Sequence, residues 1–299
     1  MAVNLDSLSV YVDENKLDLI RKTVLGPKTI GYLNLQTGVK GKTKINLLET
    51  TVTFGDGAAC GFTDNANTKL SQREIDPASV KINATFCDKK MQKYFMNHQV
   101  TVAAGRSTLP FEEHFVNSLV ESTGVELEKA IWKGVNIGGT EYKGFIGLSA
   151  DFTAVEHTVG ATIYEEVRKV YNAIPSASLA DTVIFIGMDK YRELAGELTA
   201  KNLYHYDPKV DEAFEMILPG TTTKVVGVAG LNMEGPGDTA YVIALNVKHA
   251  FYGTDMEGDE EVFDLWYSKD NQEWRAAINF VFGVQVAFPA ENVYLKLAN

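Results

Sequence analysis

The chain has 299 residues, of which 45% are hydrophobic and 22% charged, a composition typical of a folded globular protein with ample length for a core. Its 28 basic and 39 acidic residues give a net charge of −11. Because proteins that bind DNA or RNA through phosphates normally carry a basic excess, this charge argues against sequence-specific nucleic acid binding.

The beginning of the chain shows no charged segment followed by an apolar one, and no run of 18 apolar residues occurs. We therefore expect neither secretion nor membrane insertion. The cysteines Cys60 and Cys87 fit free thiols in a reducing cytosol, and the lack of a CxxC pair argues against a zinc site.

Residues 1–45 are expected to lie largely outside the core elements, as an extended arm with one short helix. Asp13 is placed to cap this helix, and Gly26-Pro27 ends it. The polar, glycine-bearing residues 28–43 predict a loop. The apolar face of the short helix consists of Leu17, Ile20 and Val24.

Residues 46–86 predict a long hairpin. The chain is rich in Thr, Val, Ile and Leu from Lys44 to Phe54, and a second extended segment from Lys69 to Phe86 is interrupted by Pro77. A two-stranded ribbon alone is marginal in water, so it must lie on another surface. That surface is either a neighbouring subunit or the ribbon's own domain.

One long helix is predicted from Leu109 to Lys133. Ser107 or Thr108 offers a side-chain cap, and Pro110 fits the first turn. About 25 residues would span roughly 37 Å, so this helix needs a broad platform or neighbouring chains to cover it. The apolar residues that recur at helical spacing are Phe111, Phe115, Leu119, Leu127 and Ile131.

A second region follows Leu148. Thr162 and Glu165 form a capping box for a helix that Pro175 ends. Asp189 is expected to cap the next helix. The predicted strands of this region are Val183–Ile186, Lys224–Leu231 and Ala240–Leu245, with a turn at Pro236-Gly237.

The C-terminal part predicts a strand from Val262 to Tyr267 and then an unusually long one from Ile278. In this last strand the even positions are large and apolar, whereas the odd positions are small or polar. A dozen residues would extend roughly 40 Å, which is long enough to serve as the platform for the long helix. The even positions are Phe280, Phe282, Val284, Val286 and Phe288.

The helix end Ile131-Trp132-Lys133-Gly134, the polar turn after it and the segment Gly144-Phe145-Ile146-Gly147-Leu148 resemble the spine helix of tailed-bacteriophage major capsid proteins. The resemblance extends over most of the chain and implies the α+β Hong Kong 97-like fold. The implied parts are an N-terminal arm (1–45), an E-loop hairpin (46–86), the spine helix and first part of the P domain (87–150), an A domain (151–250) and the last P-domain strands (251–299).

The resemblance also implies a function. Copies would assemble in the host cytoplasm as pentamers and hexamers into the icosahedral head of the virion, with the arm and the E-loop reaching across neighbours. A negative charge is tolerable for a shell that only surrounds DNA. The first 45 residues are too few for a large scaffolding extension, so a separate scaffolding protein is expected, together with a portal and decoration proteins.

The sequence offers no residue for a catalytic, cofactor-binding or metal role. Gly41-Lys42-Thr43 imitates a P-loop, but Gln36 stands where a glycine is required. Gly55-Asp56-Gly57 fits a turn better than a dinucleotide fingerprint, and the five histidines form no HxxxH or HExxH pair. The acidic run 255–261 does not match an EF-hand loop, and whether it binds a cation stays open.

Three alternatives remain. An encapsulin-like nanocompartment shell would share the fold but package proteins. A soluble α/β enzyme with scattered catalytic residues would act as a small oligomer with a deep polar pocket. A phage tail or adaptor component would form rings or tubes instead of closed shells.

Overall fold

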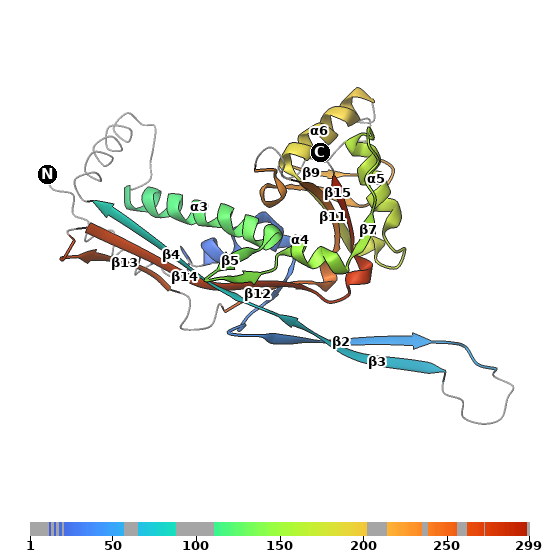
Figure 1. Cartoon of the computed structure of the whole chain (residues 1–299), viewed down its shortest axis with the longest axis horizontal. Coiled ribbons are helices and arrows are strands. Elements are labelled where there is room, and N and C mark those ends of the chain that lie inside the picture. The colour runs from blue at the N-terminus through green and yellow to red at the C-terminus, as the bar shows by residue number, and fades with distance from the viewer. Residues whose placement is uncertain are drawn as a thin grey trace.

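The computed structural model describes residues 21–56, 65–87, 111–201, 214–234, 239–255, 262–271 and 273–297, together with residues 12, 15, 18 and 19. A long helix lies on a first sheet, a second sheet with its helices stands at one end, and a hairpin projects away from both (Figure 1). The helices whose bounds lie within the described residues are α3 (Phe111–Lys133), α4 (Phe145–Leu148), α5 (Ile163–Ala173), α6 (Met188–Ala200) and the short 3₁₀ helices η1 (Lys28–Tyr32), η2 (Ser149–Asp151), η3 (Leu179–Asp181), η5 (Ala229–Leu231), η6 (Val247–His249) and η7 (Pro289–Glu291).

The first sheet is built around the 14-residue strand β14 (Glu273–Val286). Strands β12 (Ala250–Thr254) and β13 (Val262–Ser268) pair with successive parts of one edge of β14, and β4 (Ala78–Cys87) pairs with the other edge. Strand β1 (Asn34–Gln36) joins β12 in parallel. The predicted long platform strand is thus confirmed, although it begins five residues before Ile278.

The even positions of β14 are buried beneath the long helix, as the period-2 pattern predicts. The odd positions are small or polar as predicted, and among them Val281 is also buried. The buried even positions are Phe280, Phe282, Val284 and Val286. Phe288, the last predicted even position, lies beyond the end of β14, is only partly buried and packs against a different cluster.

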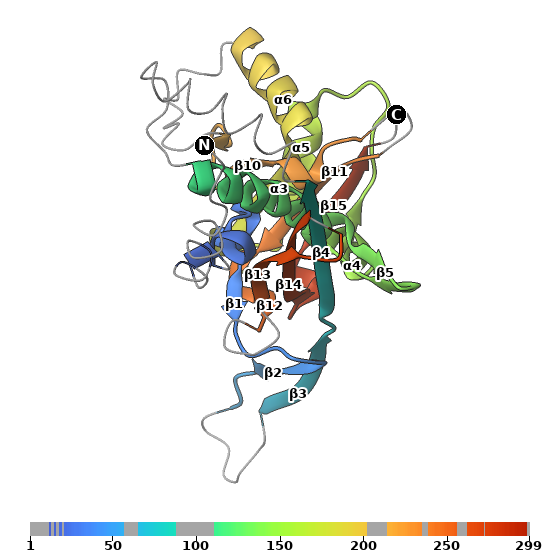
Figure 2. The same cartoon turned by 90° about the vertical axis from the view of Figure 1, so that its left-hand side faces the viewer.

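Helix α3 lies across this platform (Figures 1 and 2). Its 23 residues span roughly 34 Å. Ile131 and Trp132 near its end are fully buried. The helix ends at Lys133 as predicted, and Gly134 follows with φ +83°, where a Cβ would lie 2.4 Å from the carbonyl oxygen of Tyr142. The predicted caps Ser107 and Thr108 and the predicted first-turn Pro110 lie outside the described residues.

The second sheet has its central strand β8 (Thr182–Gly187) buried along its whole length. Helix α5 begins with the predicted capping box, in which Thr162 and Glu165 each accept a hydrogen bond from the other's backbone N–H. The strand order of this sheet is β7 (Thr153–Val155), β15 (Val293–Leu297), β11 (Ala240–Asn246), β8, β10 (Lys224–Val228) and β9 (Glu215–Ile217).

The prediction that Asp189 caps helix α6 is wrong. The N-cap residue is Gly187, and Asp189 lies inside the first turn. The N–H of Met188 donates instead to the side-chain oxygen of Asn232, at 2.6 Å. A residue 44 positions away in sequence therefore supplies the hydrogen-bond acceptor for a backbone N–H at this helix end.

The last strand, β15, lies in the second sheet, whereas all of 251–299 was expected in the P domain. It pairs with β11 on one side and β7 on the other. The chain leaves the first sheet at η7, where Pro289 stands at the start of the turn. The alternating residues Val293, Leu295 and Leu297 are then buried in the second core.

The expected hairpin 46–86 is too long. Strand β2 (Thr43–Val52) pairs with β3 (Ala66–Ile75), but β4 belongs to the first sheet. Pro77, which has no N–H to donate, separates β3 from β4. Ile75 is fully buried at this corner, and a Cβ on Gly283 would approach its Cγ2 to 2.8 Å.

Within the expected arm 1–45, several described residues pack against the body of the same chain. Val24 and Ile30 are buried in the core that contains α3. Residues 28–32 form η1 instead of part of a loop, because Ile30 and Thr29 are buried against neighbouring elements. The predicted cap Asp13 lies outside the described residues. Among the described helices, none has the length and apolar composition needed to cross a membrane.

Candidate functional site

The hairpin β2–β3 is the feature that the isolated fold leaves exposed. Its strands are ten residues long, which corresponds to roughly 34 Å, and their outer part projects from the body of the molecule (Figures 1 and 2). The base is held by Ile45 and Leu47, which are buried, and by an ion pair of 2.8 Å between Arg73 and Asp151. Beyond this base most side chains of the hairpin are exposed.

From Asn46 outward, one face of the ribbon carries no charge; we call it the uncharged face. Leu48 lies opposite Leu70, and these side chains are 63% and 79% exposed. Beyond the end of β2, Phe54 is fully exposed. The uncharged face consists of Asn46, Leu48, Thr50, Val52, Ala66, Thr68, Leu70 and Gln72.

The other face differs in composition. It buries Ile45 and Leu47 near the body, and farther out it carries the oppositely charged pair Glu49 and Lys69. An ordered ribbon with exposed leucines on one face is typical of a docking surface, because contiguous exposed apolar side chains gain free energy when a partner covers them. The uncharged face is therefore the candidate functional site.

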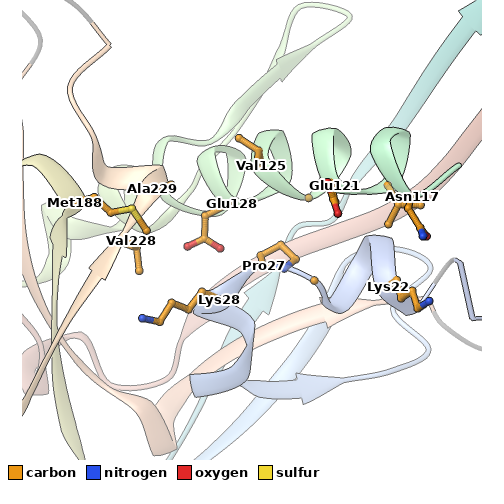
Figure 3. A pocket seen from close by; sticks show the side chains of 13 residues that line it. Lys22, Pro27, Lys28, Asn117, Glu121, Val125, Glu128, Met188, Val228 and Ala229 are labelled. Atoms are coloured by element: carbon orange, nitrogen blue, oxygen red, sulfur yellow. The ribbon is translucent and has the colours of Figure 1, made fainter. Parts of the chain in front are cut away.

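A second notable feature is a cavity of about 580 Å³ between α3, residues 22–28 and the η5 segment (Figure 3). Glu128 of α3 lines it and is only 5% exposed. Its carboxylate accepts hydrogen bonds from the hydroxyl and the N–H of Thr29. The indole N–H of Trp132 donates to the same hydroxyl at 2.9 Å.

Burial raises the pKa of Glu128 above 4.5, although the hydrogen bonds from Thr29 partly oppose the shift. The folded chain therefore binds this proton more tightly than the unfolded chain does. The stabilisation that follows is complete below pH 4.5 and is lost as the pH rises through the raised value.

Replacing Glu128 with glutamine should remove this dependence. We expect the unfolding free energy of the wild type, relative to Glu128→Gln, to fall as the pH rises above 4.5, by at most about 1.4 kcal/mol per pH unit. Urea unfolding of both proteins between pH 4 and 8 measures the difference. A difference that stays constant over this range would contradict the assignment.

Described residues of the motifs considered for catalysis or binding lie beside carboxylates. Lys42, in the segment that imitates a P-loop, forms an ion pair of 3.4 Å with Asp76 at the surface. The Nδ1 atom of His157 lies 3.5 Å from Glu166, and that of His249 lies 2.6 Å from Glu291. In the described part of the chain, no three His, Cys, Asp or Glu side chains gather where they could hold a metal ion.

The acidic run 255–261 is described only at Asp255. This side chain is fully buried, its oxygens accept no hydrogen bond from the residues that the structure describes, and Lys40 lies 4.0 Å away. The rest of the run lies outside the described residues, as does Cys60, and the side chain of Cys87 is also not described. Of the tryptophans, Trp132 and Trp274 are buried, whereas Trp266 is 44% exposed.

The hairpin was predicted from the sequence, but its uncharged face was not. A signal was present, because Leu48, Thr50, Val52 and Phe54 alternate with residues that include Glu49. The pairing of Glu128 with Thr29 had no comparable signal, since 99 positions separate the two residues.

Comparisons with known proteins bear on the fold. No family model matches the chain, and no curated protein matches it. Among solved structures, the chain is similar to a satellite phage P4 procapsid that includes size determination (Sid) protein, with a TM-score of 0.57, 10% identity and coverage of 95% of this chain and 98% of that one. For the capsid of Myoviridae phage XM1 the TM-score is 0.58, the identity 10% and the coverage 91% of each chain.

A structure from Gordonia phage Cozz gives a TM-score of 0.61 at 10% identity, over 90% of this chain and 85% of that chain. At this identity the likeness establishes the fold. The chain therefore has the α+β Hong Kong 97-like fold found in phage capsids, as the sequence predicted. The coverage shows that this fold extends over nearly the whole chain and is not confined to one segment.

Proposed function

We propose that this chain is the major capsid protein of a tailed bacteriophage. Its copies associate as pentamers and hexamers into the icosahedral head that encloses the DNA genome. The observation that carries the proposal is the uncharged face of the hairpin, which exposes Leu48 and Leu70 on a ribbon that extends beyond the body of its own chain. The fold shared with phage capsids supports it.

In this function the uncharged face packs on the next copy, and the same contact repeats around each ring. Each contact is modest alone, but closing a ring or shell makes many contacts at once, so avidity stabilises the assembly. Modest contacts also let misplaced copies dissociate before closure. The A domain, residues 151–250, supplies the contacts at the centre of each ring.

The role is structural and not enzymatic. The protein assembles in the host cytoplasm and is then located in the virion, where a net charge of −11 suits a shell that surrounds DNA without binding its sequence. Its other partners are a separate scaffolding protein, a portal and decoration proteins.

Size measurement tests this function. We expect the full chain, with its scaffolding protein where that is required, to form closed particles or large rings in negative-stain microscopy. Deletion of residues 55–67 should impair particle formation more than it lowers the thermal unfolding midpoint. A chain that stays monomeric under all assembly conditions would contradict the proposal, and particles that package protein instead of DNA would favour an encapsulin-like shell.

A further inference from the structure

The short helix η1, residues 28–32, lies at the joint between α3 and the second sheet. On one side, Thr29 donates two hydrogen bonds to the buried carboxylate of Glu128 on α3. In Figure 3 this carboxylate points from α3 toward the segment that carries Pro27 and Lys28. The contact thus ties η1 to the helix that lies on the first sheet.

On its other side, η1 contacts the second sheet. The Nζ atom of Lys28 lies 3.3 Å from a carboxylate oxygen of Glu215, which is 8% exposed on β9. The hydroxyl of Tyr32 donates to the same oxygen. The ring of Tyr32 packs edge-on against Phe185 of β8, with ring centroids 5.6 Å apart.

A tight backbone contact lies beside these polar contacts. A Cβ on Gly230 of η5 would lie 2.4 Å from the carbonyl oxygen of Glu128 and 2.5 Å from the Cδ1 atom of Trp132. Helix α3 therefore touches η5, which directly follows β10 of the second sheet, closely at this point. The cavity of about 580 Å³ lies next to it, so side chains do not fill the joint on that side.

Apolar side chains also cross the joint, because Trp132 of α3 packs against Phe185 of β8 with ring centroids 5.1 Å apart, but on the side of the cavity this packing is incomplete. Beside a cavity, packing resists rotation less than a filled interior would. Polar contacts to buried carboxylates resist it strongly, because breaking them leaves a desolvated charge without its partners.

We propose that η1 is a clamp that sets the angle between α3 and the second sheet, with the contact at Gly230 as the pivot. Lys28 and Tyr32 hold the sheet through Glu215, while Thr29 holds the helix through Glu128. This angle determines the curvature of the assembled shell, because every copy repeats it. That consequence rests on the proposed function.

The test removes the contacts to Glu215 while keeping side-chain volume, in the double variant Lys28→Met and Tyr32→Phe. The matched control is Lys224→Met. Lys224 lies 3.9 Å from the same carboxylate but belongs to β10 of the same sheet, so its contact does not cross the joint. Both variants lose one positive charge beside Glu215.

Spin labels are placed at Ser122 on α3 and at the exposed Val159 beside the second sheet, in a protein whose Cys60 and Cys87 are replaced by serine. The distribution of distances between the two labels reports the angle. Measured on unassembled protein, the distribution should become at least twofold wider in the double variant and stay unchanged in the control. Equal widths in the double variant and the parent would overturn the clamp, as would equal broadening in the control.

If the double variant fails to fold, the single variant Tyr32→Phe, which removes only one hydroxyl, replaces it in the test. It should broaden the distance distribution by a smaller factor. In particles, the double variant should give a wider spread of diameters than the control. If the parent forms no particles, the proposed function fails, whereas the distance measurement still decides whether the clamp exists.

Discussion

Replacing both Leu48 and Leu70 with glutamate should strongly impair particle formation while leaving the fold of the single chain intact. The two side chains are 63% and 79% exposed in the isolated chain, so charging them costs little there. In an assembled shell the same carboxylates would be buried against a neighbour, at an effective cost of several kcal/mol per ion. The cost recurs at every copy.

The concentration needed for assembly should rise more than tenfold, where each factor of ten corresponds to about 1.4 kcal/mol per contact. Sedimentation velocity and negative-stain microscopy measure assembly, and circular dichroism follows the fold.

The matched control for this prediction carries the same two charges on the opposite face. Thr51 and Asn67 form a cross-strand pair on the face that also bears Glu49 and Lys69. Thr51→Glu with Asn67→Glu should leave assembly nearly normal. Assembly of the Leu48 and Leu70 variant at wild-type concentrations, or equal failure of the control, would show that the uncharged face is not the docking surface.

Replacing Trp132 with alanine should produce the largest loss of stability among single substitutions in this chain. The indole is fully buried and packs against Phe145 and Phe185, with ring centroids 5.3 and 5.1 Å away. It also donates a hydrogen bond to Thr29 at 2.9 Å. Deleting a buried tryptophan side chain costs roughly 3–5 kcal/mol, because it loses apolar contact and leaves a cavity.

Urea unfolding monitored by far-UV circular dichroism measures this loss. Trp266→Ala is the control, because the same side chain is removed from a position that is 44% exposed on β13. The control should lose less than about 1 kcal/mol. Equal losses in the two variants would mean that α3 does not rest on a core centred on Trp132.

Elements with strong periodicity could be predicted from the sequence, because local chemistry decides them. The end of α3 at Lys133, the capping box of Thr162 and Glu165, and the apolar alternation in β14 all appear where the sequence placed them. Each depends on contacts between residues a few positions apart, or on a repeat that one face of an element must satisfy.

The partners of these elements could not be predicted, because pairing depends on residues far apart. β3 and β4 are both extended and are separated only by Asp76 and Pro77, yet β3 pairs with β2 and β4 pairs with β14 of the first sheet. β15 follows directly after β14 but pairs with β11, and no local pattern distinguishes the two sheets. At the start of α6, the residue type favoured Asp189 as the N-cap over its neighbours in sequence. In the structure, the side chain of Asn232, from another element, accepts the hydrogen bond at that helix end.

The candidate site was predictable in part. An exposed hairpin follows from strand-forming residues on both sides of a turn, and its uncharged face follows from the alternation that begins at Asn46. The joint around η1 was not predictable. Residues 28–43 are polar and rich in glycine, so the sequence predicts a loop, whereas Thr29 finds its partner Glu128 only in the folded chain.

The central claim is that the hairpin is stabilised by contact with a sister copy. A photo-crosslinking amino acid at the fully exposed position of Phe54 tests it most directly, in particles assembled from equal amounts of isotopically light and heavy chains. We predict that about half of the crosslinked peptide pairs join a light to a heavy chain, as random mixing of neighbouring copies requires. If every crosslinked pair is light with light or heavy with heavy, both peptides come from the same chain. That result would contradict the claim.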